Sequence, residues 1–259
     1  MTTRTPRPAK VGRPRAVSDA EPDTSPRDQI LRAAAGLFVE QGFGTTSTRA
    51  IAEAVGIRQA SLYYHFAGKD EILSELLETS VRPSVEIAQA LLERVGDDPV
   101  AAAATLYALA LVDVRTLAGT PHNIGTLYLL PETQDPRYDG FRGERDRLQG
   151  IYGRLGAIVR GAGGAGGAGS VGGAGSVGGS AAGGVASLEE PLLGAVLIQL
   201  VEVVIQLRRA SAVAGPGSAS VPAEVDGPAI AASCLRLLGL DDEAIARAAG
   251  AAAGLLPVV

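Results

Sequence analysis

The sequence predicts an all-α protein with a small N-terminal three-helix domain of the helix-turn-helix type and a larger C-terminal helical domain. Apolar residues recur at helical spacing along most of the chain, and capping and stop residues bound the periodic segments. With 259 residues, of which 46% are hydrophobic, the chain can hold two packed domains. We assign residues 1–24 to a disordered basic arm, 25–69 to the three-helix domain and 70–259 to the helical domain.

Residues 45–69 carry the helix-turn-helix pattern. Ile51 belongs to an apolar face at helical spacing, and Gly56 stands where a left-handed residue would end that helix. Leu62 and Phe66, four residues apart, would point a second helix into the same core. Such a second helix is the one that enters the major groove of DNA in helix-turn-helix proteins.

The side chains that remain on the outer face have the chemistry of a DNA contact. Arg49 and Arg58 can each donate two hydrogen bonds to a guanine edge, and Gln59 can pair in the same way with adenine. Lys69 follows Gly68 at the start of the next helix, where backbone amides also favour an anion. The predicted contacts to double-stranded DNA are Thr46, Ser47, Thr48, Arg49, Arg58, Gln59, Ser61, Tyr63, Tyr64, His65 and Lys69.

The segment from Ile30 to Leu73 resembles the DNA-binding domain of the TetR family of bacterial transcriptional regulators. The run Leu-Tyr-x-His-Phe-x-x-Lys at residues 62–69 is the most specific part, and the resemblance covers roughly a fifth of the chain. It implies a homodimeric repressor that a small-molecule ligand releases from its operator, without identifying the ligand or excluding an activator. The matching residues are Ile30, Ala33, Ala34, Leu37, Phe38, Glu40, Gly42, Phe43, Thr46, Arg49, Ile51, Ala52, Gly56, Leu62, Tyr63, His65, Phe66, Lys69 and Leu73.

The charge distribution agrees with a DNA-binding head on an acidic body. The whole chain carries a net charge of −5, yet residues 1–69 hold ten Lys/Arg against six Asp/Glu, and residues 70–259 hold thirteen against twenty-two. In the arm, Arg13 and Arg15 flank Pro14 and could enter a minor groove. An ordinary solvated tail is the equally weighted alternative.

Other classes of protein are disfavoured by the composition. Two histidines and a single cysteine, Cys234, are too few for a metal cluster or an internal disulfide, and we expect no cofactor. No apolar signal segment begins the chain, and a charge interrupts every long apolar run, so we expect a cytoplasmic protein with no membrane span. The match of residues 161–166 to a dinucleotide-binding glycine motif lacks the required strand and helix.

Caps and stops divide the remainder into helices. The first helix of the chain should begin after Ser25 and end at Gly42. Pro83 should break or kink the helix that follows Lys69, leaving a second segment from Ser84 to Val95. Residues 161–186 form a flexible Gly-rich linker, and the charged residues 142–147 should face solvent. Further helices are expected at 99–118, 120–130, 135–160, 188–210, 228–238 and 241–253.

An effector pocket is expected among the helices at 99–118, 121–130, 137–160 and 188–210. The candidate ligand contacts, each with an ordinary structural interpretation as well, are Tyr107, Asp113, His122, Asn123, Tyr128 and Gln199. The alternatives are an architectural DNA binder without an effector and, less favoured, an enzyme that uses the Asp113/His122 region.

The apolar helix at 188–210 and the helix bearing Cys234 suit a symmetric four-helix dimer interface, which is also how the resemblance implies that two subunits associate. The predicted interface residues are Leu193, Val196, Leu197, Leu200, Val204, Cys234 and Leu235.

Overall fold

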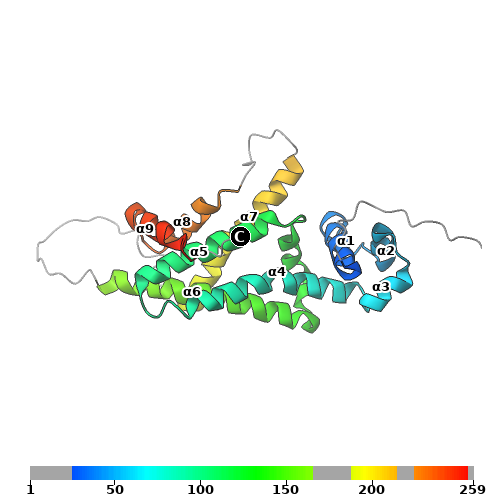
Figure 1. Ribbon diagram of the computed structural model, residues 1–259, viewed down its shortest axis with the longest axis horizontal. Helices are drawn as coiled ribbons and strands as arrows, with labels where there is room; N and C mark the ends of the chain where they lie inside the picture. Colours follow the sequence, from blue (N-terminus) through cyan, green and yellow to red (C-terminus); the bar gives the residue numbers. More distant parts are fainter. Residues whose placement is uncertain (1–24, 166–187, 215–224, 256–259) are drawn as a thin grey trace, which may run out of the picture.

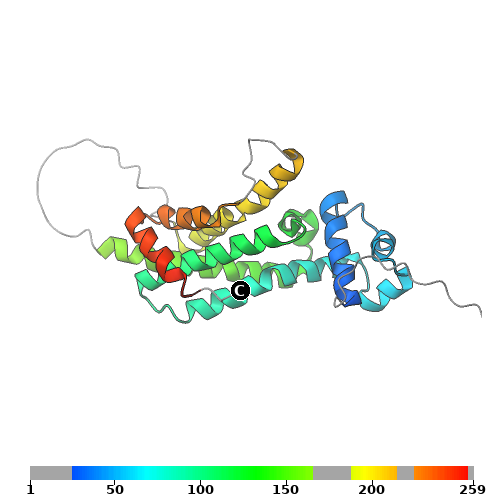
Figure 2. The same ribbon diagram turned by 45° about the horizontal axis from the view of Figure 1, so that its top comes forward.

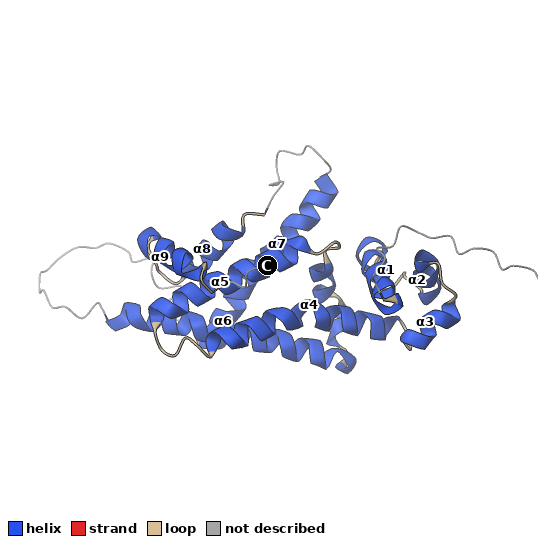
Figure 3. Cartoon of the chain, viewed as in Figure 1, coloured by secondary structure: helices blue, strands red, loops and turns tan. Residues whose placement is uncertain are grey.

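The computed structural model describes residues 25–165, 188–214 and 225–255, and every regular element in these ranges is a helix (Figure 3). The all-α prediction is therefore confirmed. The basic arm with Arg13 and Arg15 lies outside the described residues, as does most of the predicted Gly-rich linker. The first five residues of that linker, 161–165, belong to a helix.

The N-terminal domain forms one end of the molecule (Figure 1). Its first helix begins as predicted, because the Ser25 hydroxyl oxygen accepts a hydrogen bond from the Asp28 amide at 3.2 Å. Gly56 ends the second helix with a φ of 74°, a left-handed conformation that suits glycine. The helices are α1 (Pro26–Gln41), α2 (Thr48–Val55) and α3 (Gln59–His65), and their shared core includes Ile30, Phe38, Phe43, Ile51, Leu62 and Phe66.

A single long helix, α4 (Lys69–Leu92), joins the two domains and runs without a break through Pro83. The predicted break at Pro83 is wrong. Pro83 is exposed, while Val81, Ser84 and Val85 on either side of it are buried against the helical domain. This packing maintains the helix despite the hydrogen bond that a proline removes.

The helical domain packs α4, α5 and α6 side by side, with the C-terminal helices α8 and α9 over the part of α5 that lies far from the DNA-binding domain (Figures 1 and 2). The bounds agree with the predicted ranges to within a few residues, except that the segment predicted as a helix at 120–130 is a shorter 3₁₀ turn. The elements are α5 (Pro99–Gly119), the 3₁₀ turns η1 (Ile124–Leu129), η2 (Pro131–Gln134) and η3 (Pro136–Tyr138), α6 (Asp139–Ala165), α7 (Glu190–Ala214), α8 (Gly227–Leu237) and α9 (Asp242–Ala252).

Two of these helices, α5 and α7, are long and apolar enough to cross a membrane by length and composition alone. In α5, 67% of the most apolar window is buried within the domain, so this helix serves as its core. In α7 only 39% of the corresponding window is buried. More of α7 than of α5 is therefore exposed.

Helices α6 and α7 make the most extensive contact in the structure, and glycines permit it. A Cβ atom at Gly194 of α7 would collide with the carbonyl oxygen of Gln149 on α6 and with the amide of Gly153. A Cβ at Gly153 would likewise collide with the Glu190 carbonyl oxygen. Backbone therefore meets backbone at this crossing, and no side chain fits between the helices.

We predict that Gly194→Ala destabilises the protein by about 1–3 kcal/mol, because the helices must separate to admit the methyl group. Gly150→Ala is the matched control, since Gly150 lies on α6 with nothing within 4 Å of an added Cβ. It should stabilise by roughly 0.5–1 kcal/mol through helix propensity. Urea unfolding measures both, and equal effects of the two changes would contradict the close crossing.

Candidate nucleic-acid interface and helical-domain cavity

The outer face of α3 lies at the end of the molecule farthest from the helical domain (Figure 1). Arg58 stands at its N-cap and is exposed, as are Gln59 and Ser61. Tyr63 and Tyr64 expose 50% and 87% of their surface, so two large aromatic side chains stand next to each other in solvent. Such exposed rings beside an arginine suit a phosphate and base surface.

Hydrogen bonds between α2 and α3 orient part of this face. The Gln59 side-chain amide donates to the Thr48 hydroxyl at 3.0 Å, and that hydroxyl lies 3.1 Å from the hydroxyl of Tyr63. Arg49 on α2 donates to the Glu53 carboxylate at 2.8 Å, and both side chains are exposed. Because an exposed ion pair contributes little stability, DNA phosphates can compete for this arginine.

The remaining exposed positions of the predicted surface have simpler surroundings. Ser47 accepts a hydrogen bond from the Ala50 amide at 3.1 Å and caps α2. His65 is half-buried and lies edge-on to the Tyr64 ring, with the ring centres 5.3 Å apart. These contacts leave Ser47 at a helix N-terminus, where an anion is favoured.

Two predicted DNA contacts have structural roles: the prediction is wrong for Thr46, whereas for Lys69 it stays a prediction. Thr46 is buried, and its hydroxyl donates to the carbonyl oxygen of Gly42 at 2.8 Å. The Lys69 ammonium group donates to the carbonyl oxygens of Phe43, Gly44 and Thr46 at 2.8, 3.2 and 3.2 Å. An ammonium has three donors, and these bonds direct them to the loop between α1 and α2.

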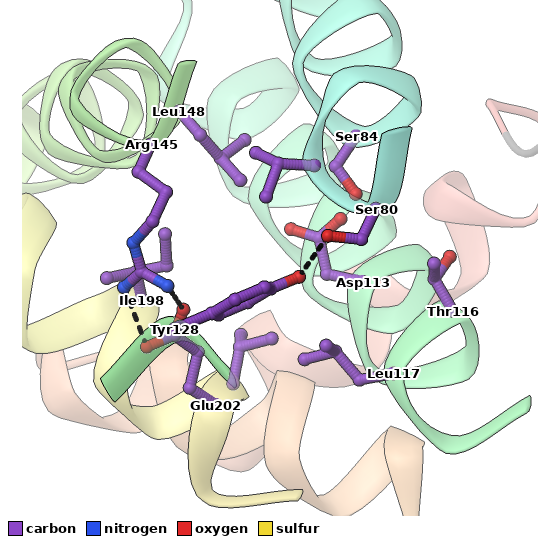
Figure 4. A pocket seen from close by; sticks show the side chains of 12 residues that line it. Ser80, Ser84, Asp113, Thr116, Leu117, Tyr128, Arg145, Leu148, Ile198 and Glu202 are labelled. Atoms are coloured by element: carbon purple, nitrogen blue, oxygen red, sulfur yellow. Dashed lines mark hydrogen bonds and ion pairs between the residues drawn. The ribbon is translucent and has the colours of Figure 1, made fainter. Parts of the chain in front are cut away.

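A cavity of about 30 Å³ lies between the helices of the C-terminal domain (Figure 4). Asp113 of α5 and Tyr128 of η1, two of the candidate ligand contacts, line it. The predicted pocket omitted the connecting helix α4, which contributes Ser80 and Ser84. The other lining residues are Val81, Thr116, Leu117, Arg145, Leu148, Ile198, Val201 and Glu202.

Arg145 and Glu202 form an ion pair at the cavity wall. The two guanidinium nitrogens of Arg145 lie 2.7 and 3.0 Å from the two Glu202 oxygens, and both side chains are largely buried. The Arg145 guanidinium also stacks over the Tyr128 ring at 4.9 Å. The prediction that the charged face of residues 142–147 is solvated is therefore wrong for Arg145, which α7 covers.

Asp113 is the most deeply buried charge in this region, with 5% of its surface exposed. The Tyr152 hydroxyl donates to its Oδ2 at 2.7 Å, while no hydrogen bond of normal geometry reaches Oδ1. Burial raises the pKa of Asp113 to about 6, against the smaller opposing effects of hydrogen bonds from Ser84 and Tyr152. Burial also raises the pKa of Tyr128 to about 12, so this hydroxyl stays protonated and bonds to Ser80 at 2.8 Å.

Four predicted ligand contacts do not line this cavity. Tyr107 is buried in the core of α5. His122 packs against α1, where a Cβ at Gly36 would lie 3.0 Å from the imidazole Cε1. The Asn123 side-chain amide donates to the Ile205 carbonyl at 2.8 Å, and Gln199 is exposed and donates to the Glu202 carboxylate at 3.0 Å.

The enzyme alternative loses its geometric basis, because His122 does not share the Asp113 cavity. In the described ranges, no group of three or more His, Cys, Asp or Glu side chains is arranged to hold a metal ion.

Most of the predicted dimer interface is the core of a single subunit. Leu193, Leu197, Val204, Cys234 and Leu235 are fully buried within the protomer, so they cannot contact a second subunit. These predictions are wrong because α7 is apolar almost all round, and the sequence pattern does not say which face turns inward. The half-buried Val196 and Leu200 remain accessible.

We predict that Lys69→Ala lowers the free energy of unfolding by about 1–3 kcal/mol, because three backbone carbonyls lose their donor. Arg58→Ala is the matched control: it should change stability by less than roughly 0.5 kcal/mol, yet weaken DNA binding. Urea unfolding and fluorescence anisotropy with labelled DNA separate the two effects. A stable Lys69→Ala variant that binds DNA poorly would contradict the structural role.

We also predict that Asp113→Asn stabilises the protein at pH 8, by on the order of 2–3 kcal/mol. The folded-state pKa of Asp113 is raised from 3.8 to about 6, so its contribution to stability is greatest below pH 3.8 and is lost as the pH rises through 6. Asparagine does not titrate, so the advantage of the variant should vanish at pH 4. Urea unfolding at both pH values tests this, and an equal difference at each would contradict it.

Comparison with known proteins agrees with this geometry. Residues 30–76 match the family model described as "Bacterial regulatory proteins, tetR family". The transcriptional repressor KstR2 of Mycobacterium tuberculosis H37Rv is 47% identical over 53 residues, which span 20% of this chain and 26% of KstR2. The match thus spans about a quarter of that relative. The regulator TcmR of Streptomyces glaucescens is 30% identical over 136 residues, covering 51% of this chain and 58% of TcmR.

A solved structure provides the longer match. The crystal structure of Mycobacterium smegmatis AmtR superposes with a TM-score of 0.70 at 37% sequence identity, covering 90% of this chain and 95% of AmtR. The similarity therefore includes the helical domain and its connecting helix. With the helix-turn-helix surface and the domain order both matched, the chain belongs to the TetR family of bacterial regulatory proteins.

Proposed function

We propose that this protein is a homodimeric repressor that binds operator DNA through α2 and α3 and is released by a small molecule bound in the helical domain. The observation that carries the proposal is the exposed polar and aromatic face of α3, held in register with α2 by the bonds among Thr48, Gln59 and Tyr63. Relatives named as a repressor and as a transcriptional regulator support it. A dimer would place two recognition helices in successive major grooves, roughly 35 Å apart.

The cavity favours an effector-responsive regulator over an architectural DNA binder. A domain that served only to dimerise would have no use for a buried carboxylate, an ion pair and several hydroxyls around an internal space. The cavity also touches α4 through Ser80 and Ser84, and α4 begins in the DNA-binding domain. A ligand that moves these residues would therefore move the DNA-binding domain.

A second connection runs through η1. Tyr128 at one end of this turn lines the cavity and bonds to Ser80 of α4. His122, just before the turn, packs on Gly36 of α1. A ligand that displaces Tyr128 would thus act on both α1 and α4. It would lower DNA affinity if the two DNA-binding domains of the dimer no longer had the spacing that the operator requires.

The dimer is proposed to form through the outer face of α7, with a surface shifted from the one predicted. Leu192 and Val203 expose 54% and 38% of their surface and lie eleven residues apart, on one face of the helix. Val196 and Gln199 lie between them on the same face. An exposed apolar face of this kind is stabilised when it is buried from solvent, and a two-fold symmetric pairing of α7 helices would bury it.

Selection of operator sequences from a random DNA library tests the proposed function. The full-length protein should enrich a two-fold symmetric site with half-sites about one helical turn apart. Arg58→Ala should lose affinity for this site by roughly tenfold or more, because a bidentate contact to guanine is worth about 1–3 kcal/mol. A library that shows no enriched sequence after repeated rounds would contradict operator recognition.

For the dimer, we predict that Val203→Asp gives a folded monomer, because two facing aspartates would be buried without partners. Leu197→Asp is the contrasting control: Leu197 is fully buried within the protomer, so its replacement should unfold the domain. Sedimentation and circular dichroism distinguish the two results. A Val203→Asp protein that remains a dimer would place the interface elsewhere.

A further inference from the structure

The cavity in the helical domain has an uncompensated negative charge. Three of its lining residues are charged, namely Asp113, Arg145 and Glu202. Arg145 is held by both oxygens of Glu202, so these two charges compensate each other. Asp113 has only neutral hydrogen-bonding groups beside it, the hydroxyls of Tyr152 and Ser84, and none of the described donors reaches its Oδ1 atom with normal hydrogen-bond geometry.

The groups around Asp113 form a polar end and an apolar end. The carboxylate shares the space with the hydroxyls of Ser80 and Ser84 on α4, and Thr116 lies one turn beyond Asp113 on α5 (Figure 4). Apart from the Tyr128 ring and the Arg145–Glu202 pair, the other surfaces of the cavity are aliphatic, formed by Leu117, Leu148, Ile198 and Val201 together with Val81. A ligand that fits must therefore carry a hydrogen-bond donor at one end and a short apolar group at the other.

We propose that the effector is a small protonated amine or amidine with a short apolar chain, whose cationic group binds Oδ1 of Asp113. The assignment rests on the proposed function and specifies the chemical class of its ligand. The cation would supply the missing donor and neutralise the buried charge at the same time. The cavity of about 30 Å³ is far smaller than the roughly 300–1,000 Å³ of drug-sized ligand pockets, so the ligand is small and the surrounding helices must move apart to admit it.

An anionic effector does not fit the same groups. It would face the carboxylates of Asp113 and Glu202, and the cation in the cavity, Arg145, is already paired with Glu202: its Nη2 donates a hydrogen bond to the carboxylate at 3.0 Å, and its Nη1 lies 2.7 Å from the other oxygen. Removing Arg145 from that pair would leave a buried Glu202 without a counter-charge, which is strongly disfavoured. A neutral ligand could donate to Oδ1 but would leave the negative charge in place.

Binding of a cation should depend on the ionisation of Asp113. Burial raises the pKa of this carboxyl to about 6, so a cation must displace a proton below that pH. The affinity should be about tenfold weaker at pH 5 than at pH 7. The pKa values of Tyr128 and Cys234 are raised to about 12, so neither changes charge in this window. The titratable or charged groups that face Asp113 or its partner Tyr152 are Tyr128 of η1, Arg145 and Tyr152 of α6, Glu202 of α7 and Cys234 of α8.

Calorimetry on the full-length protein tests the proposal with three probes of equal length: propylammonium, propanol and propionate. Propylammonium should bind at least tenfold more tightly than propanol, and propionate should bind most weakly. Asp113→Asn should abolish the preference for the cation. Asp146→Asn, which removes the same charge from the exposed side of α6, should keep it. The Asp113→Asn variant should fold, because asparagine can accept the Tyr152 hydrogen bond.

Other results would overturn the amine assignment. One such result is that propanol or propionate binds as tightly as propylammonium or more tightly, or that propylammonium does not bind at all. Another is that Asp113→Asn keeps the preference for the cation. A third is that the affinity of the wild type for propylammonium does not fall between pH 7 and pH 5. The last measurement needs no variant. Operator binding, measured in the same preparations, distinguishes a failure of the proposed ligand class from a failure of the proposed function. Operator release by an anionic or neutral ligand would overturn only the chemical class, whereas failure to bind any operator would overturn the proposed function.

Discussion

The close crossing of α6 and α7 is the constraint on which the helical domain depends. At Gly194 the two backbones touch, and this contact sets how the two helices meet along the rest of their length. Arg145 and Glu202 meet on the same pair of helices, where a guanidinium can approach both oxygens of a carboxylate only if the backbones are held at short range. The pair in turn positions Tyr128, whose ring lies under the guanidinium. A wall of the cavity is thus a consequence of helix packing.

Helix α4 connects this cavity to the DNA-binding domain as a continuous helix. Its first residue, Lys69, holds the loop between α1 and α2 through three carbonyl oxygens, and Ser80 reaches the cavity eleven residues later, about 17 Å along a helix axis. Pro83 does not interrupt this connection, because buried residues on both sides hold the helix. A lysine that resembled a phosphate contact therefore couples the two domains mechanically.

The sequence was sufficient to predict most of the helices, since many of them are bounded by a local signal. Gly56 adopts the left-handed conformation expected of it, and Asp98, Asp226 and Asp241 cap the helices that follow them. The identity of the inward face of α7 could not be predicted in this way. A helix that is apolar all round has no hydrophobic stripe to orient it, so buried and exposed residues were confused. One signal was available: a lone Glu202 in an apolar helix requires a buried partner.

The buried carboxylate of Asp113 explains how binding of a ligand in the cavity can change the conformation of the protein. Asp113 raises the energy of the folded state at neutral pH, because its charge is desolvated and lacks a counter-ion. A ligand can shift a conformational equilibrium only by as much as it binds the two states differently. The charge provides such a difference, since a cation gains most in the conformer that encloses Asp113 and least in one that opens it to water. The Tyr128–Ser80 bond lies between this charge and α4, so a ligand that occupies the cavity changes the bond through which the two domains are linked.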